Sequence, residues 1–350
     1  MMEKRGSGFL GFGVTLEFLS LGVVMLFSLA LSYAAFFVDA SYLLPSFDNA
    51  LLHSGRVRYV YDAGFWIPYE LVFGGVAPSY HVPAYASLVS ALAHVTGLNW
   101  LWAIRLFGLL MAVLLPLGFY LLGKELSNWQ AGVAAAFLVL LSNGVMTWGT
   151  RPSAISLGLV LVVFLLYFVL KGMWPAVVLG AFVLGLTHPP SLLVFFGASG
   201  LYWTLTVLRR GVDVSRFTGY LLELPLVGSL VGFGTYVAWH VSLTGTSCLW
   251  FQCLPQLGAR EFGASVDLVG KALSLPYALG YLGVAWLLFS KADWDKKFLV
   301  AAWLAATLLL VKNDVFGVGV FTERFVAFFE MALALSGGLV LGLLFEKVRA

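Results

Sequence analysis

Long apolar runs separated by short polar breaks recur along the whole chain, and they decide what it can fold into. An apolar run of about 17–25 residues has the length at which a helix crosses a bilayer. An outer-membrane barrel would instead show strands of about ten residues with alternating polarity, and none is evident. We expect ten helices, over residues 12–38, 100–123, 130–148, 153–170, 174–187, 191–208, 219–243, 268–289, 298–311 and 325–345. The sequence therefore predicts an all-α polytopic membrane protein with about ten transmembrane helices.

The low fraction of charged residues limits the classes of function that the chain can have. Charged residues make up 11% of the chain, whereas a soluble domain carries about 25%. This shortage excludes a disordered chain, a nucleic-acid-binding protein and an ordinary soluble enzyme. We expect residues 1–350 to form a single transmembrane domain.

Twelve of the 20 basic residues fall at alternate connections between the apolar runs. They are Lys4, Arg5, Lys124, Lys171, Arg209, Arg210, Arg216, Lys291, Lys296, Lys297, Lys347 and Arg349. Because Lys and Arg accumulate in the cytoplasmic connections of membrane proteins, this side and both termini are expected in the cytoplasm. We therefore expect a multi-pass protein of the plasma membrane, with outer loops over residues 39–99 and 244–267.

The first outer loop, residues 39–99, is far longer than a simple turn, and loops of this length are usually functional when they are ordered. Its many aromatic residues suit the membrane interface. Leu44, Phe47 and Leu51 fall on one helical face, which predicts a short helix lying in the interface. Residues 81–97 are apolar enough to be half-embedded.

Three carboxylates of this loop are candidates for chemistry. Asp39 ends the first apolar run and is either a hydrated helix-end residue or a residue of the site, as a general base or as a carboxylate that orients the donor. Asp48 borders the interfacial helix and is either a cap for the helix that follows or a second catalytic candidate. Glu70 is a solvated loop charge or a substrate contact, and the nearby Trp66 could stack on a sugar.

Charged residues also mark the outer ends of other helices. Arg151 and Arg324 either extend to lipid headgroups or clamp a lipid-linked phosphate, which suits guanidinium geometry. Glu323 and Glu330 share one face of the last helix, and Glu330 should lie about 10 Å deeper. An acid at that depth is costly unless it is paired or lines a cavity, so a hydrogen bond to another helix is expected.

Two histidines and two cysteines complete the candidates. His188, in GLTHPPS, and His81, in PSYHVPAY, are each a structural hydrogen-bonding residue or a substrate contact. Cys248 and Cys253 would face the oxidising side and are expected to form a disulfide. We find no Walker, GxGxxG or HExxH motif, so nucleotide hydrolysis and zinc proteolysis are unsupported. The sequence specifies no cofactor and leaves a divalent metal open.

The order of these elements resembles the GT-C superfamily of membrane glycosyltransferases, of archaeal or bacterial type. Asp39 follows the first run, Gly55 comes sixteen residues later, and an aromatic loop leads into the step Thr96-Gly97-Leu98 followed by Arg105. Further matches are TRPSAISLGL opening a run, LTHPPS at an outer turn and ERF before the last run. The resemblance covers residues 12–210 well and the remainder weakly.

The resemblance implies an enzyme that transfers a sugar from a polyprenyl-phosphate donor to a lipid, glycan or protein acceptor on the outer face. Asp39 matches the catalytic aspartate of that family, with Asp48 as the other candidate base, and Arg324 matches a donor-phosphate contact that Arg151 would assist. Because no large soluble segment follows the last run, a branch other than the oligosaccharyltransferases is expected. Membrane lipids and glycan-assembly proteins are the other expected partners.

Two alternatives belong to other functional classes. A carrier for a lipid-linked or small polar substrate would place polar groups in a passage at the bilayer midplane, which Glu17 and Glu330 could line. A catalytically inactive GT-C-like subunit would act as a scaffold in glycan assembly.

Overall fold

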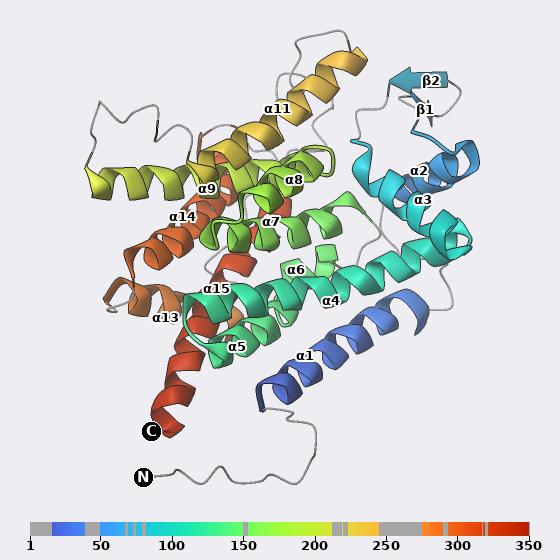
Figure 1. The fold of residues 1–350 in the computed structure, drawn as a ribbon. Helices are drawn as coiled ribbons and strands as arrows, with labels where there is room; N and C mark the ends of the chain where they lie inside the picture. Colours follow the sequence, from blue (N-terminus) through green and yellow to red (C-terminus); the bar gives the residue numbers. More distant parts are fainter. Residues whose placement is uncertain are drawn as a thin grey trace.

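The computed structural model describes residues 16–38, 50–66, 69–72, 75–78, 82–149, 153–211, 219, 223–244, 275–289, 293–316, 318 and 321–349. Within them the chain is helical apart from one hairpin (Figure 1). The helices are α1 (Leu16–Tyr33), its π-helical continuation η1 (Ala34–Val38), α2 (Ala50–Ala63), α3 (Ala84–Thr96), α4 (Trp100–Leu126), α5 (Trp129–Leu140), α6 (Asn143–Gly149), α7 (Ala154–Leu170), α8 (Trp174–Gly185), α9 (Pro189–Arg210), α11 (Leu224–Thr244), α13 (Leu275–Phe289), α14 (Trp294–Val311), the 3₁₀ turn η5 (Asn313–Phe316) and α15 (Thr322–Arg349).

Each of the ten apolar runs contains a helix within the described residues, which confirms where the helices were predicted, although one run is divided in two. Polar residues at the start of several runs provide the caps. The Asn99 side chain accepts a hydrogen bond from the backbone N–H of Trp102 at 3.0 Å, and Asn128 accepts one from Ala131 at 2.8 Å. These bonds satisfy N–H groups that have no partner within the helix, so each helix begins at its asparagine.

Four helices of the described residues are long and apolar enough to span a membrane: Leu16–Phe37, Trp100–Leu126, Pro189–Arg210 and Thr322–Val348. The bent pair of α5 and α6 makes a fifth if it is one span. Other apolar helices have 10–17 residues, and a helix of 12 residues rises only about 18 Å against a hydrocarbon core of about 30 Å. The chain is thus an integral membrane protein, and the full number of ten crossings stays a prediction.

The segment predicted as one helix over 130–148 is broken. α5 ends at Leu140, α6 begins at Asn143, and the two axes differ in direction by 72°. The Ser142-Asn143-Gly144 sequence at this point favours turns, which provides a local cause for the break.

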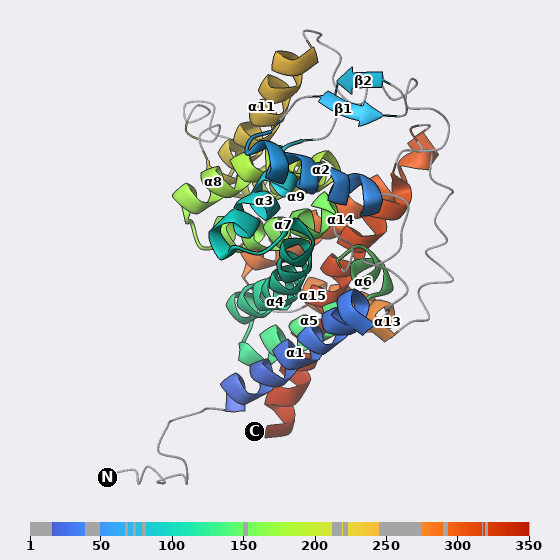
Figure 2. The same ribbon diagram turned by 90° about the vertical axis from the view of Figure 1, so that its right-hand side faces the viewer.

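Between α1 and α4 the chain forms α2, a β-hairpin and α3, which Figures 1 and 2 show together at one end of the bundle. Strands β1 (Tyr69–Val72) and β2 (Gly75–Pro78) are antiparallel, with Tyr69 opposite Pro78 and Val72 opposite Gly75. The all-α prediction was wrong for these eight residues, because β-branched and aromatic residues around glycines favour a hairpin. The helix α2 begins at Ala50, two residues after Asp48, while residues 44 and 47 of the predicted interfacial helix lie outside the described part, so that helix stays a prediction.

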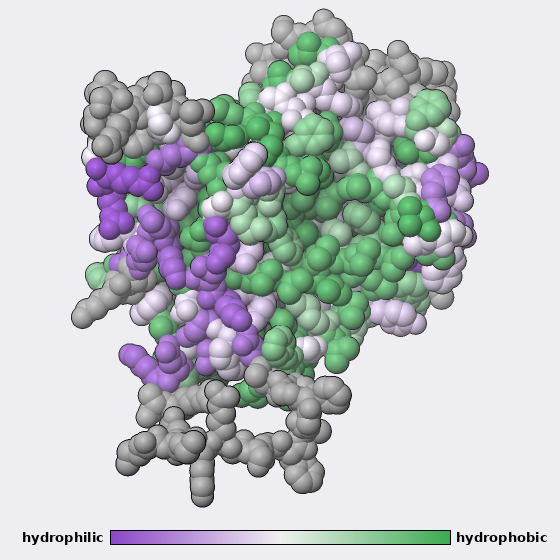
Figure 3. All heavy atoms as spheres, in the orientation of Figure 1, coloured by the Kyte–Doolittle hydropathy of each residue, from purple (hydrophilic) through white to green (hydrophobic). Residues whose placement is uncertain are grey.

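A broad hydrophobic belt separates hydrophilic margins in Figure 3. Ion pairs gather where α9 ends and α14 begins: Lys171 lies 3.1 Å from Glu125, and Arg210 lies 2.7 Å from Glu223. Lys296 donates to the carbonyl oxygen of Glu125 at 2.6 Å, which brings α14 to the same margin. Basic residues expected on one membrane side therefore do lie together.

The core of the bundle is α15, which packs against α5, α13 and α14. Glycines let the backbones approach closely, as is usual for helices that associate in a membrane. A Cβ atom at Gly338 would lie 2.5 Å from the backbone nitrogen of Ala135, and one at Gly342 would lie 2.5 Å from that of Ala131. The contact of α15 with α5 therefore admits no side chain at either position.

We expect Gly338→Ala to lower the free energy of unfolding by about 1–3 kcal/mol, because the added methyl group overpacks a backbone contact. Gly200→Ala in the middle of α9 is the matched control, since nothing lies within 4 Å of a Cβ atom there. Thermal unfolding of the detergent-solubilised protein measures both changes. Equal transition temperatures for the two variants would contradict close packing between α5 and α15.

Candidate functional site

Several predicted site residues lie outside the described residues: Asp39, Asp48, His81, Arg151, Cys248 and Cys253. Glu70 lies in β1, where the structure describes the backbone. The site is therefore built from Arg324, Glu323, Glu330, His188 and Trp66, with the residues that surround them.

Arg324 stands in the first turn of α15 between aromatic rings. Its guanidinium carbon lies 4.3 Å from the centre of the Phe321 ring and 5.8 Å from that of Trp148 on α6. Aromatic faces attract a cation at these distances and hold the guanidinium in place. Glu323, its neighbour, is exposed in the same first turn, where a negative charge is favoured by the helix dipole.

Phe321 adopts an unusual backbone conformation to make this arrangement. Its φ angle is +52°, in the left-handed region that residues with a side chain rarely occupy. Its carbonyl oxygen accepts hydrogen bonds from the backbone N–H groups of Arg324 at 2.9 Å and Phe325 at 3.1 Å. The cost of the left-handed conformation is thus offset by bonds that start α15, with the ring buried against Arg324.

Glu330 lies deep in the bundle with 2% of its surface exposed. Its Oε2 accepts hydrogen bonds from the backbone N–H groups of Gly144 at 2.6 Å and Val145 at 3.2 Å. Its Oε1 accepts one from the Tyr277 hydroxyl on α13 at 2.9 Å. The predicted hydrogen bond from Glu330 to another helix is confirmed, and these donors supply the pairing that a buried carboxylate requires.

His188 caps a helix. Its Nδ1 accepts a hydrogen bond from the backbone N–H of Ser191 at 3.3 Å and lies 2.8 Å from the Ser191 hydroxyl oxygen. Two prolines follow it at the first positions of α9, where their missing N–H groups are harmless. The structure thus gives His188 the structural role that the sequence left open beside substrate contact.

Trp66 follows α2 at the hairpin end of the molecule. Its indole N–H is buried, and no hydrogen-bond acceptor lies within reach of it among the described residues. Buried donors of this kind normally have a partner. The side chain packs against the hydrophobic core and keeps one hydrogen-bond donor that has no partner among the described residues.

The sequence did not single out the partners of the arginines. Trp148 and Phe321 enclose Arg324, and Arg105 lies 4.9 Å from the Trp102 ring and 5.2 Å from the Phe37 ring. Phe37 precedes Asp39 by two residues, so Arg105 stands beside the described end of that segment. An aromatic residue three positions before an arginine, as in Phe321 and Trp102, was the available local signal.

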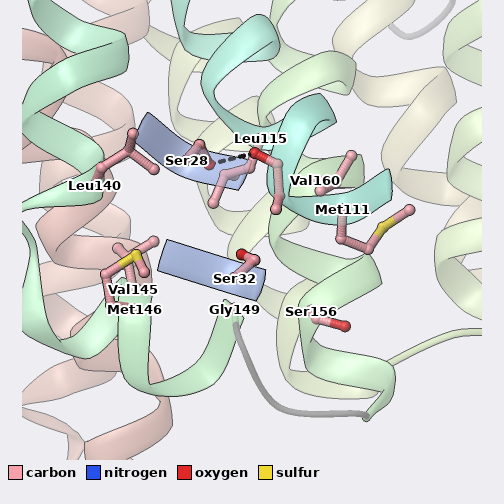
Figure 4. Close-up of a pocket in the computed structure, with 11 residues that line it drawn as sticks. Ser28, Ser32, Met111, Leu115, Leu140, Val145, Met146, Gly149, Ser156 and Val160 are labelled. Atoms are coloured by element: carbon pink, nitrogen blue, oxygen red, sulfur yellow. Dashed lines mark hydrogen bonds between the residues drawn. The ribbon is translucent and has the colours of Figure 1, made fainter. Parts of the chain in front are cut away.

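A small hollow with about 20 Å³ of free space lies between α1, α4, α5, α6 and α7 (Figure 4). Its lining is apolar apart from three serine hydroxyls. The lining residues are Ser28, Ser32, Met111, Ala112, Leu115, Leu140, Val145, Met146, Gly149, Ser156 and Val160. Neither Glu17 nor Glu330 lies in it, because Glu17 bonds Lys124 and Tyr120, and Glu330 bonds α6 and α13. This hollow therefore gives the carrier alternative no charged passage.

The described residues contain no group of three or more His, Cys, Asp or Glu side chains that could hold a metal ion. The remaining potential oxygen ligands of the site, Asp39 and Asp48, lie outside them. No chemical step is assigned to a metal here.

No protein-family model and no curated protein matches the chain. Solved structures do. The apo oligosaccharyltransferase from Archaeoglobus fulgidus gives a TM-score of 0.64 at 12% identity, over 94% of this chain and 51% of the enzyme. The chain shares the fold of its transmembrane part.

Two further structures from that organism agree. The oligosaccharyltransferase tethered to an acceptor peptide with the NVT sequon gives a TM-score of 0.65 at 14% identity, over 94% of this chain and 50% of the enzyme. AglB with an inhibitory peptide and a dolichol-phosphate gives a TM-score of 0.64 at 13% identity, over 94% of this chain and 51% of the enzyme. The chain thus spans about half the length of these GT-C enzymes. We expected a different branch of GT-C enzymes, and the likeness to oligosaccharyltransferases is one of fold.

We expect His188→Asn to leave stability nearly unchanged, because asparagine also accepts a hydrogen bond at a helix start. His188→Leu should cost about 1 kcal/mol of unfolding free energy, since it removes the cap. Thermal unfolding in detergent measures both. A fall in sugar-donor affinity for His188→Asn at unchanged stability would instead identify His188 as a substrate contact.

Proposed function

We propose that the protein is an inverting membrane glycosyltransferase, which transfers a sugar from a polyprenyl-phosphate donor to a lipid, glycan or protein acceptor on the outer face. The observation that carries the proposal is the GT-C fold, which extends over 94% of the chain. AglB, with that fold, was solved with a dolichol-phosphate, so a lipid-linked donor is the natural substrate class. Arg324, enclosed by aromatic rings at the start of α15, supplies a suitable cation.

The proposed topology follows from the distribution of the basic residues. The ten helical runs cross the plasma membrane as one domain, both termini lie in the cytoplasm, and the α2–hairpin–α3 segment lies outside. The margin with the ion pairs of Lys171 and Arg210 is then the cytoplasmic one.

In the proposed reaction, Asp39 accepts the proton of the acceptor nucleophile, with Asp48 as the alternative base. The deprotonating oxygen or nitrogen attacks the anomeric carbon, and the bond from that carbon to the phosphate oxygen breaks. Arg324, assisted by Arg151, stabilises the negative charge that grows on the leaving phosphate. Attack from the face opposite the phosphate inverts the anomeric configuration.

The remaining predicted contacts surround the sugar. Trp66 would stack on it, while His81 and Glu70 would contact it from the neighbouring loop. Glu323 stands beside Arg324 at the surface, where it would face the donor headgroup.

Transfer of a radiolabelled sugar from polyprenyl phosphate to membrane acceptors tests the proposed base. Asp39→Asn should slow transfer by about 10²–10⁴-fold, because it removes a general base. Asp62→Asn is the matched control, since that exposed carboxylate pairs only loosely with Arg58 at 3.6 Å. Undiminished transfer in Asp39→Asn would remove Asp39 from the mechanism.

Arg324→Ala should slow transfer by about 10²-fold or more, whereas Arg324→Lys should retain part of the activity as a point charge. Arg58→Ala controls for loss of an exposed outer cation. A purified wild-type chain that binds donor but transfers no sugar would support the inactive scaffold alternative. Vesicle uptake of a lipid-linked substrate without transfer would support the carrier.

A further inference from the structure

We propose that Glu330 is a positioning residue: by holding the start of α6 against α15, it keeps Trp148 beside Arg324. What Arg324 binds rests on the proposed function, whereas the placement of α6 does not. Glu330 touches no substrate in this scheme and acts through two other side chains.

The break between α5 and α6 creates the need for such a residue. A helix that begins inside an apolar bundle leaves its first N–H groups without partners, and each costs free energy in such surroundings. Glu330 accepts hydrogen bonds from the backbone N–H groups of Gly144 and Val145, the second and third residues of α6. Its negative charge also stands at the positive end of that short helix, where it is favoured.

The closeness of the contact requires Gly144. A Cβ atom at this position would lie 2.8 Å from Oε2 of Glu330 and 3.1 Å from its carboxyl carbon. The Tyr277 hydroxyl holds the other oxygen from α13, so the carboxylate cannot retreat without losing that bond. α6 is thereby fixed relative to α13 and α15.

The opposite face of α6 borders a small hollow. Val145, Met146 and Gly149 line this hollow between α1, α4 and α7 (Figure 4). A Cβ atom at Gly149 would meet its nearest neighbours only at 3.9 and 4.0 Å. The side-chain hydrogen bonds that hold the start of α6 thus come from its α15 side.

The contact of Glu330 with Gly144 and the contact of Arg324 with Trp148 both join α15 to α6. Gly144 and Trp148 are four residues apart on α6, a rise of about 6 Å, and Glu330 and Arg324 are six apart on α15, about 9 Å. Gly144 meets the deeper residue of α15 and Trp148 the shallower one. α6 thus runs against α15, held at its buried start by Glu330, with its far end at Arg324.

The test begins with the placement of α6, measured without any donor. Spin labels at positions 147 and 323, in full-length protein with Cys248 and Cys253 replaced by serine, report the distance between α6 and α15. Glu330→Leu and Gly144→Ala should each lose the single narrow distance distribution. Glu330→Gln, which can still accept the N–H bonds, and Gly149→Ala, the matched glycine change on the same helix, should keep it.

Binding of dolichyl monophosphate in detergent micelles then tests the link to Arg324. Glu330→Leu should weaken binding about tenfold, as expected for lost hydrogen bonds to a charged group, and should have no further effect in an Arg324→Ala background. Elution volume and the thermal transition identify variants that have merely unfolded. An unchanged distance distribution in Glu330→Leu, or equal losses of binding in both backgrounds, overturns the proposal.

The two failures are distinguishable. If α6 moves in Glu330→Leu but the wild-type chain binds no dolichyl monophosphate, the proposed function and the role of Arg324 fail while the placement of α6 by Glu330 stands. If α6 keeps its place in Glu330→Leu while the wild-type chain transfers sugar, the inference fails and the proposed function stands.

Discussion

The carboxylate of Glu330, accepting two backbone N–H groups at the start of α6, is the interaction that permits a broken helix inside this bundle. In water such N–H groups would bond solvent, but within an apolar protein they need an internal partner. A neutral acceptor would satisfy the bonds, and a carboxylate adds a charge that the helix dipole favours. The position of Trp148, and through it the surroundings of Arg324, depends on this one side chain.

The tight packing of α15 lets this interaction affect residues elsewhere on the helix. This helix carries Arg324 and Glu330, and glycines at 338 and 342 bring its backbone directly against α5. A helix packed this tightly transmits position along its length, because it cannot shift without breaking backbone contacts. The buried Glu330 and the surface residue Arg324 are therefore held in place by the same helix.

Hydrophobic length alone predicted where the helices lie, because the crossing of a bilayer is a local property of the chain. The break at residues 141–142 was missed although Ser142-Asn143-Gly144 is a turn-forming sequence, since the surrounding apolar run masked it. The hairpin was missed because its strands have only four residues each. The partners of Glu330 and Arg324 could not be predicted, because residues 144 and 148 lie far away in sequence and meet them only in the folded bundle.

α1 has a different relation to the bundle from α15. Only 17% of its spanning segment is buried, and the bonds of Glu17 with Lys124 and Tyr120 anchor its first turn. The 22-residue spanning segment extends about 33 Å, close to the hydrocarbon thickness of about 30 Å. Through hydrophobic mismatch, bilayer thickness therefore sets the depth in the membrane at which the chain leaves α1, just before Asp39. The depth of Arg324 is set instead by the packing of α15 within the protein.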